Sequence, residues 1–311
     1  MTKIIKSLML AAAMFPLAQC ATLSPVGTAV AQTPAAAPIV SEDADPALWV
    51  VKDADTTVYL FGTVHMLKPG LSWFDEAVKE AFDASDTLKI EVVLPEDQAE
   101  MVSRTIPLAI DQSGTKISSL LTDEQRTAYE AAMSKFGLPI AQFDMFEPWF
   151  SGLTLGAVAL TAEGYNPEQG SEKILTAAAK ASGKPVSGLE TLEQQLGFFD
   201  TLPRDAQIKF LNDTVAQLPT AGGEFADILL AWKQGNPDEL GIRMNRALSG
   251  AEIIAETLLF KRNERWADWI KTRLDEPGTV FMAVGAGHLA GAKSVQDYLA
   301  VRGLTVQRIS Y

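Results

Sequence analysis

Val58-Tyr-Leu-Phe-Gly-Thr-Val-His65 is the stretch on which the expected fold depends, an apolar run that reaches a glycine and then a histidine. A near copy, Val280-Phe-Met-Ala-Val-Gly-Ala-Gly-His288, lies close to the other end of the chain. Each has the pattern of a short β-strand followed by Gly-x-x-His. The two copies carry the only two histidines of the 311-residue chain. We therefore expect the two strands to lie near each other in one sheet, with both imidazoles facing one site.

A single histidine at a strand end is more often a hydrogen-bonded structural residue than a ligand. Glycine just after a strand is likewise an ordinary turn residue, so Gly62 and Gly285 carry little weight alone. The repetition of the same frame, more than two hundred residues apart, is what favours a shared site over two structural histidines.

Two acidic residues have strand-end positions of their own. Glu91 interrupts the apolar strand expected at 87–93, and a carboxylate buried there needs a partner. A salt bridge to lysine or arginine would satisfy it, and so would a metal ion shared with the histidines, since two imidazoles and one carboxylate form a common hydrolytic metal set. Glu190 ends the short strand expected at 184–190. It either reaches the same site or caps the helix that begins near Leu192.

The order of elements predicts an α/β protein. A β-hairpin, 48–51 with 57–61, leads into the first Gly-x-x-His, and a helix from Ser72 to Phe82 connects it to the strand of Glu91. Strand, helix and strand in this order indicate a right-handed crossover and a parallel sheet. In such a sheet the ligand site lies outside the carboxyl ends of the strands, where His65 stands.

Helical patterns dominate residues 95–273, and the second half of this region contributes further candidates. Arg262 and Asn263, on the last long helix, are able to reach the site, although a solvated surface is the commoner place for such side chains. A helix is expected from Ala290 to Ala300, directly after His288. Its N-terminal backbone N–H groups would lie beside His288 and could hold an anionic group.

The N-terminus has the pattern of an export signal. Lys3 and Lys6 precede a short apolar segment, and Ala29-Val-Ala31 is a small-x-small cleavage site, so we assign residues 1–31 to a signal peptide and 32–45 to a flexible linker. Residues 46–311 then form a single domain in a periplasmic or secreted protein. Leu17-Ala-Gln-Cys20 leaves a lipoprotein anchored at Cys20 as the alternative.

Charge and composition exclude some partners. Cleavage would remove two lysines, leaving 24 basic against 39 acidic side chains, a net charge of −15. Such an acidic surface argues against nucleic acid and anionic membrane as partners, and the mature sequence has no apolar stretch of transmembrane length. Cleavage would also remove the only cysteine, so no thiol nucleophile remains. Neither a P-loop, a Gly-x-Ser-x-Gly elbow nor a His-Glu-x-x-His motif is present.

An ordered set of motifs resembles the TraB/GumN family, in its exported GumN-like branch. The set consists of Phe61-Gly-Thr-Val-His65, Leu88-Lys-Ile-Glu91, Gly188-Leu-Glu-Thr191 followed by Gln194-Gln195, Arg262-Asn263 and Gly285-Ala-Gly-His288. The resemblance covers nearly the whole mature chain. It implies an erythromycin esterase/ChaN-like fold, with a central, mostly parallel sheet in two related halves and a large helical middle region.

The resemblance also implies a function. The family includes the Tiki proteins, which look like metal-dependent peptidases supported by manganese or cobalt. By position, His65, His288 and Glu91 would hold the divalent ion, expected to be manganese, cobalt or zinc. Glu190 would act as general base or fourth ligand, and Arg262 would stabilise negative charge. The residues expected to bind a peptide or small-molecule substrate are Gly62, Thr63, Gly285, Gly287 and Asn263.

Two other functions stay open on the sequence. The same residues, with Met66 nearby, would also suit a non-enzymatic protein that sequesters a peptide or haem. The kinship with erythromycin esterase suggests instead a metal-independent esterase, with a histidine as base beside Glu91. The oligomeric state is not predicted.

Overall fold

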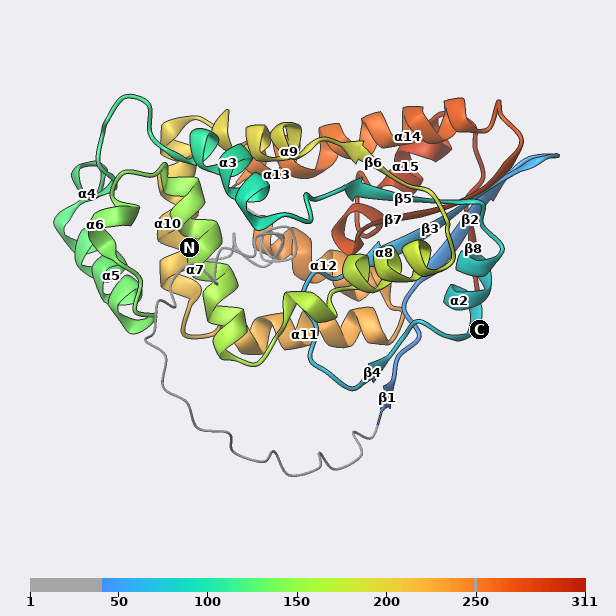
Figure 1. Ribbon diagram of the computed structural model, residues 1–311, viewed down its shortest axis with the longest axis horizontal. Coiled ribbons are helices and arrows are strands. Elements are labelled where there is room, and N and C mark those ends of the chain that lie inside the picture. The colour runs from blue at the N-terminus through green and yellow to red at the C-terminus, as the bar shows by residue number, and fades with distance from the viewer. Residues whose placement is uncertain (1–40, 249–250) are drawn as a thin grey trace.

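A computed structural model describes residues 41–248 and 251–311 (Figure 1). The predicted signal peptide, Cys20 and most of the predicted linker lie outside these residues. At the end of the predicted linker, Glu42–Asp43 forms strand β1, which pairs in parallel with β4, Leu71–Ser72.

The centre of the molecule is a six-stranded sheet in the order β6-β5-β7-β3-β2-β8. Its first four strands are mutually parallel, and β2 runs antiparallel to both of its neighbours. The mostly parallel sheet predicted from the sequence is therefore confirmed. The strands span Leu48–Lys52 (β2), Thr56–Thr63 (β3), Thr87–Val92 (β5), Val186–Glu190 (β6), Gly278–Gly285 (β7) and Gln307–Ile309 (β8).

Helices cover both faces of the sheet and extend beyond it. In chain order they are α2 (Glu76–Asp83), α3 (Gln98–Ala109), α4 (Ile117–Leu120), α5 (Asp123–Lys135), α6 (Ile140–Phe143), α7 (Pro148–Ala162), α8 (Ser171–Ala181), α9 (Leu192–Asp200), α10 (Arg204–Gln217), α11 (Ala221–Lys233), α12 (Pro237–Leu248), α13 (Glu252–Ala255), α14 (Lys261–Arg273) and α15 (Val295–Val301). Short turns of 3₁₀ helix occur at Pro167–Gln169 (η2) and Ala286–Leu289 (η4), and one π-helical turn at Glu256–Phe260 (η3).

Alternation along the strands produces two hydrophobic cores. Successive side chains of a strand point to opposite faces, so Phe61 packs with α2, α8, α11 and α12, whereas Leu60 packs with α14 and α15 on the other face. A separate helical region, built around α7 and α10, extends from one end of the sheet (Figure 1). The result is a three-layer α/β/α arrangement with a helical extension.

Two local expectations are wrong, and one of the two alternatives for Glu190 is excluded. Helix α2 begins at Glu76 with Asp75 as its N-cap residue, and Ser72 lies in β4, where its hydroxyl donates to the Asp75 carboxylate. The helix expected at Ala290 begins only at Val295, because Ser294 provides its cap through a capping box. Glu190 does not cap α9, since Thr191 accepts a hydrogen bond from the Gln194 N–H.

Candidate functional site

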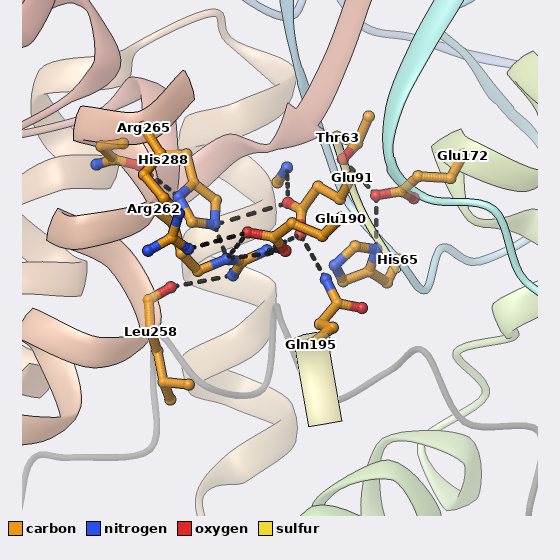
Figure 2. A network of polar contacts seen from close by, with 12 residues as sticks. Thr63, His65, Glu91, Glu172, Glu190, Gln195, Leu258, Arg262, Arg265 and His288 are labelled. Carbon is orange, nitrogen blue, oxygen red and sulfur yellow. Dashed lines mark hydrogen bonds and ion pairs between the residues drawn. The ribbon is translucent and has the colours of Figure 1, made fainter. Parts of the chain in front are cut away.

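The two Gly-x-x-His motifs lie side by side, as their sequences predict. Strands β3 and β7 are adjacent and parallel, with Thr63 opposite Gly285. His65 follows the end of β3, and His288 lies in η4, directly after β7. Glu91 comes from β5, the other neighbour of β7, and Glu190 is the last residue of β6. All four side chains are buried at the carboxyl ends of the parallel strands (Figure 2).

Glycines allow the two motifs to approach each other closely. A Cβ at Gly62 would stand 3.0 Å from the Cα of Ala286, so a larger residue would push η4 away from β3. The Gly62 carbonyl also accepts a hydrogen bond of 2.7 Å from Nε1 of Trp232 on α11. At Gly287 a Cβ would lie 2.0 Å from the Cε of Met244 on α12, the movable end of a flexible side chain, so this glycine is less constrained than Gly62.

Gly285 marks the point on which three polar side chains converge. A Cβ at this glycine would lie 3.1 Å from Oε1 of Glu91, 3.6 Å from Cδ2 of His288 and 3.9 Å from Nε2 of His65. The Gly285 N–H donates a hydrogen bond of 2.6 Å to Oε1 of Glu91. The backbone of β7 therefore holds the Glu91 carboxylate between the two imidazoles.

His65 is oriented by Glu172, the second residue of α8. Nδ1 of His65 lies 2.6 Å from Oε1 of Glu172, and the fully buried Thr63 hydroxyl donates to the same oxygen. Burial lowers the pKa of His65, but the charge and hydrogen bond of Glu172 outweigh burial, so the net pKa is raised. Because Nδ1–H is committed to Glu172, Nε2 is the nitrogen that faces the site.

The N-terminus of α8 is docked against the first motif by backbone contacts. The Ser171 N–H donates to the Val64 carbonyl at 2.9 Å, and the Val64 N–H donates to the Ser171 hydroxyl oxygen at 3.1 Å. Gly170 lies against the His65 carbonyl, and a Cβ at position 170 would be only 2.2 Å from the His65 carbonyl oxygen. These contacts explain how Glu172, more than a hundred residues away in the chain, reaches His65.

His288 is oriented by Asn263 in an analogous way. Oδ1 of Asn263 lies 2.6 Å from Nδ1 of His288, and Nδ2 of Asn263 donates to the Lys293 carbonyl at 2.7 Å, which fixes the direction of the amide. Since Oδ1 can only accept, Nδ1 of His288 carries the proton, and Nε2 is an acceptor that Nη1 of Arg262 approaches at 3.3 Å. Burial, together with the positive charge of Arg262, lowers the pKa of His288 to about 3, so the ring is neutral.

Arg262 is the centre of a buried ion-pair network. Its Nη2 donates to Oε2 of Glu91 at 2.6 Å and to Oε2 of Glu190 at 2.7 Å, while Nε donates to Oε1 of Glu190 at 2.8 Å. Nη1 donates to the Leu258 carbonyl at 3.0 Å and lies 3.3 Å from Nε2 of His288. The salt bridge that the sequence left open for Glu91 is therefore present, and it includes both acidic strand ends.

Within this network the pKa values of the two carboxylates are shifted in opposite directions. Burial alone would raise the pKa of Glu91, but the charge of Arg262, the two histidines and the Gly285 N–H lower it to about 2. For Glu190 burial dominates, and its pKa is raised despite Arg262. Glu91 is therefore the fixed anion of the site, further held by Nε2 of Gln195 at 2.9 Å.

The helix that carries Arg262 and Asn263 has a π-helical turn, η3, directly before them. Such turns are frequent at functional sites because they shift the side chains that follow. Here two consecutive residues, Arg262 and Asn263, are both 2% exposed and both point into the site. This turn has no counterpart in the hydrophobic pattern of the sequence.

The donor atoms suit a divalent cation, but the side chains do not close around one. Both histidines present Nε2 while Nδ1 is held by Glu172 or Asn263, the usual outer partners of metal-bound imidazoles. Within the described residues, however, no three His, Cys, Asp or Glu side chains are grouped as a metal site. The Arg262 guanidinium stands beside both Glu91 and Nε2 of His288, where it already supplies a positive charge.

A cavity of about 530 Å³ opens onto the site. His65, Glu91 and Glu172 contribute to its lining, and the rest comes from β5 and the segment that follows it, the start of α3, η2, α8 and the start of β6. Met66 does not face this cavity. It is 1% exposed in the hydrophobic core between the sheet and α11.

Except for Met66, each residue predicted for the site lies in or directly beside this cluster, and the structure assigns contacts there to Glu172 and Gln195 as well. Glu172 follows a loop and not a strand, so the strand-end pattern does not indicate it. Thr63, Gly285 and Asn263 form hydrogen bonds with other side chains of the cluster, namely Glu172, Glu91 and His288. No substrate contact is needed to explain their burial.

The fold and the site define an α/β protein with a buried polar cluster at the carboxyl ends of parallel strands. The family model of the TraB/PrgY/gumN family matches residues 47–308, and the chain belongs to this family. An uncharacterized protein of Treponema pallidum (strain Nichols) is 21% identical over 275 residues, covering 82% of this chain and 80% of the relative. No solved structure matches. None of the described helices is long and apolar enough to cross a membrane.

Proposed function

We propose that this protein is an exported, metal-dependent hydrolase of peptides, with its centre at His65, Glu91 and His288. The observation that carries the proposal is the convergence of these three side chains on Gly285, with each imidazole held at Nδ1 and turned inward at Nε2. The open cavity at His65 and Glu91 supplies access for a substrate.

Charge supports a cation at this place. Three carboxylates belong to the cluster: Glu91 and Glu190 pair with the buried Arg262, and Glu172 pairs with His65. The half-exposed Arg265 lies 3.5 Å from Glu190. A bound divalent ion would polarise a carbonyl and lower the pKa of a bound water from ~15.7 toward ~7. His65, His288 and Glu91 would hold it, and Glu172 and Asn263 would keep the imidazoles in place.

The roles of Arg262 and Glu190 follow from their contacts. Arg262 donates to both Glu91 and Glu190, so it fixes Glu91 and supplies positive charge beside any anion that develops at the site. Both oxygens of Glu190 are engaged by Arg262. We therefore assign Glu190 to positioning Arg262, in preference to the role of general base or fourth ligand.

A second candidate, a metal-independent esterase-like hydrolase, is favoured by the position of Arg262 beside Nε2 of His288. In this mechanism the guanidinium takes the electrostatic part of the ion, and His65, oriented by Glu172, acts as general base. A base held by a third group is the arrangement expected for such catalysis.

One experiment separates the two candidates. The mature protein, residues 32–311, is purified without chelator and without a histidine tag, and its metal content is measured beside the His65→Ala/His288→Ala double mutant. About one equivalent of manganese, cobalt, zinc or iron in the wild type, absent from the mutant, supports the first candidate. No metal after reconstitution with each ion refutes it, and hydrolysis that persists in chelator supports the second.

We also propose that the fold is related to that of erythromycin esterase and ChaN, with two related halves, and that the protein is related to the Tiki proteins. We further propose that the protein is exported through its N-terminal leader, which is either cleaved after Ala31 or processed to give a lipoprotein anchored at Cys20. Mass spectrometry of the protein recovered from its native host would distinguish the two forms.

A further inference from the structure

The cavity beside the site is long enough to hold more than the reacting group. It begins at His65, Glu91 and Glu172 and continues between α8 and residues 93–98, the segment that connects β5 to α3. Its volume, about 530 Å³, lies within the range of roughly 300–1,000 Å³ that is typical of ligand sites. The lining outside the polar cluster therefore has to determine which ligand fits.

Away from the cluster, the walls are largely apolar. They are formed by Ile90, Val92, Leu94, Met101, Ala177 and Val186. The four charged side chains of these walls form two pairs, Lys180 with Glu96, and Lys173 with Glu168 at 3.4 Å. Because each charge has an opposite partner, this part of the cavity offers no uncompensated charge to an ionic ligand.

The segment after β5 also presents backbone groups. Leu94 precedes Pro95, which favours an extended conformation, and the β5 pairing with β6 ends at Val92. Among the described residues, no backbone hydrogen-bond partner is found for the N–H or C=O of Leu94 and Glu96. An extended peptide pairs its backbone with such unpaired groups and places alternate side chains in pockets.

We infer that the cavity binds an extended peptide segment with an apolar side chain against Met101 and Val186, its backbone pairing beside Leu94. This places the adjoining peptide bond at His65 and Glu91. The inference rests on the proposed hydrolase function, but binding and cleavage can be measured separately.

Ala177→Phe provides the test. Ala177 is exposed on α8 and lines the cavity, so phenylalanine fills the cavity without entering the core. Ala181→Phe is the matched control, because Ala181 is also an exposed alanine of the same helix but does not line the cavity. Circular dichroism verifies that both variants fold as the wild type does.

The probes are two fluorescein-labelled octapeptides that differ only at their central residues, leucine in one and aspartate in the other. Anisotropy is measured with the mature protein, residues 32–311, in chelator, where the proposed metal-dependent cleavage is switched off. We expect the leucine peptide to bind at least about 10-fold more tightly than the aspartate peptide. Ala177→Phe should abolish this difference, Ala181→Phe should preserve it, and N-methylation of the central amides should weaken binding.

Equal binding of the two peptides, no binding of either, or an unchanged preference in Ala177→Phe would overturn the inference. Cleavage is then followed by mass spectrometry after addition of manganese, cobalt or zinc. Selective binding without cleavage by any ion would support the peptide cleft and count against the proposed metallopeptidase. Cleavage without preference between the peptides would support the proposed metallopeptidase and count against the peptide cleft.

Discussion

Gly170→Ala is the substitution that most directly tests how the site is assembled. Gly170 has φ −60° and ψ 146°, which alanine adopts without strain, so only space opposes the change. The new Cβ would lie 2.2 Å from the His65 oxygen, 2.8 Å from the His65 carbonyl carbon and 3.0 Å from the Pro167 oxygen. All three are backbone atoms, so α8 must move away from the strand end.

The cost follows from what that movement breaks. Forcing one extra carbon into a packed site costs about 1–3 kcal/mol. Three hydrogen bonds join Ser171 and Val64, the third from the Ser171 hydroxyl to the Val64 carbonyl at 3.2 Å, and each contributes about 0.5–1.5 kcal/mol. Because the movement would relieve part of the clash, we expect the free energy of unfolding to fall by about 2–4 kcal/mol. Glu172 would move with α8, so His65 would lose its orienting carboxylate.

The assay is urea unfolding, with Gly197→Ala as the matched control. Gly197 lies within α9, and a Cβ there would meet nothing within 4 Å. Alanine in a helix interior is favoured over glycine by about 0.5–1 kcal/mol, so the same substitution is expected to stabilise at this position. A Gly170→Ala protein as stable as the wild type would refute the docking of α8 on His65.

Two further substitutions test the polar cluster by similar measurements. Arg262→Gln should lower the free energy of unfolding by about 3–5 kcal/mol, because Glu91 would remain buried without its main partner. The control, Arg265→Gln at a half-exposed position on the same helix, should lower it by no more than about 1 kcal/mol. Equal losses in the two variants would contradict a central role for Arg262. Glu172→Gln should lower the pKa of His65 in the metal-free protein, as followed by NMR titration of the chain's two imidazoles; an unchanged pKa would show that Glu172 does not hold His65.

The predictions that succeeded depend on local pattern combined with the geometry of parallel sheets. The two Gly-x-x-His segments are β-like and end in the same frame, and strands with that property place their ends at one edge of a sheet. Their pairing, with Thr63 beside Gly285, follows from this. The strand of Glu91 is also predicted, since its apolar neighbours need burial on both faces.

The order of strands was not predictable in the same way. The sequence joins β3 to β5 through α2, yet β7, from the far end of the chain, lies between them. Hydrophobic periodicity indicates which faces are buried, but it does not indicate which strand lies between two others. The position of His288 in η4 was not predictable either, because the capping box at Ser294 makes α15 begin only after the glycine-rich turn.

The partners of the two histidines show most clearly where local reasoning ends. Glu172 and Asn263 lie on helices, and each contacts an imidazole only because a separate device brings its helix close: Gly170 for α8, and the π-turn η3 for α14. A glycine with a φ of −60° at the end of a 3₁₀ turn and a helix with one extra residue per turn both look unremarkable in the sequence. Yet these two devices decide which nitrogen of each histidine faces Glu91. The residues that orient the site are therefore determined by packing between distant elements, while the residues at its centre are determined by the ends of the strands.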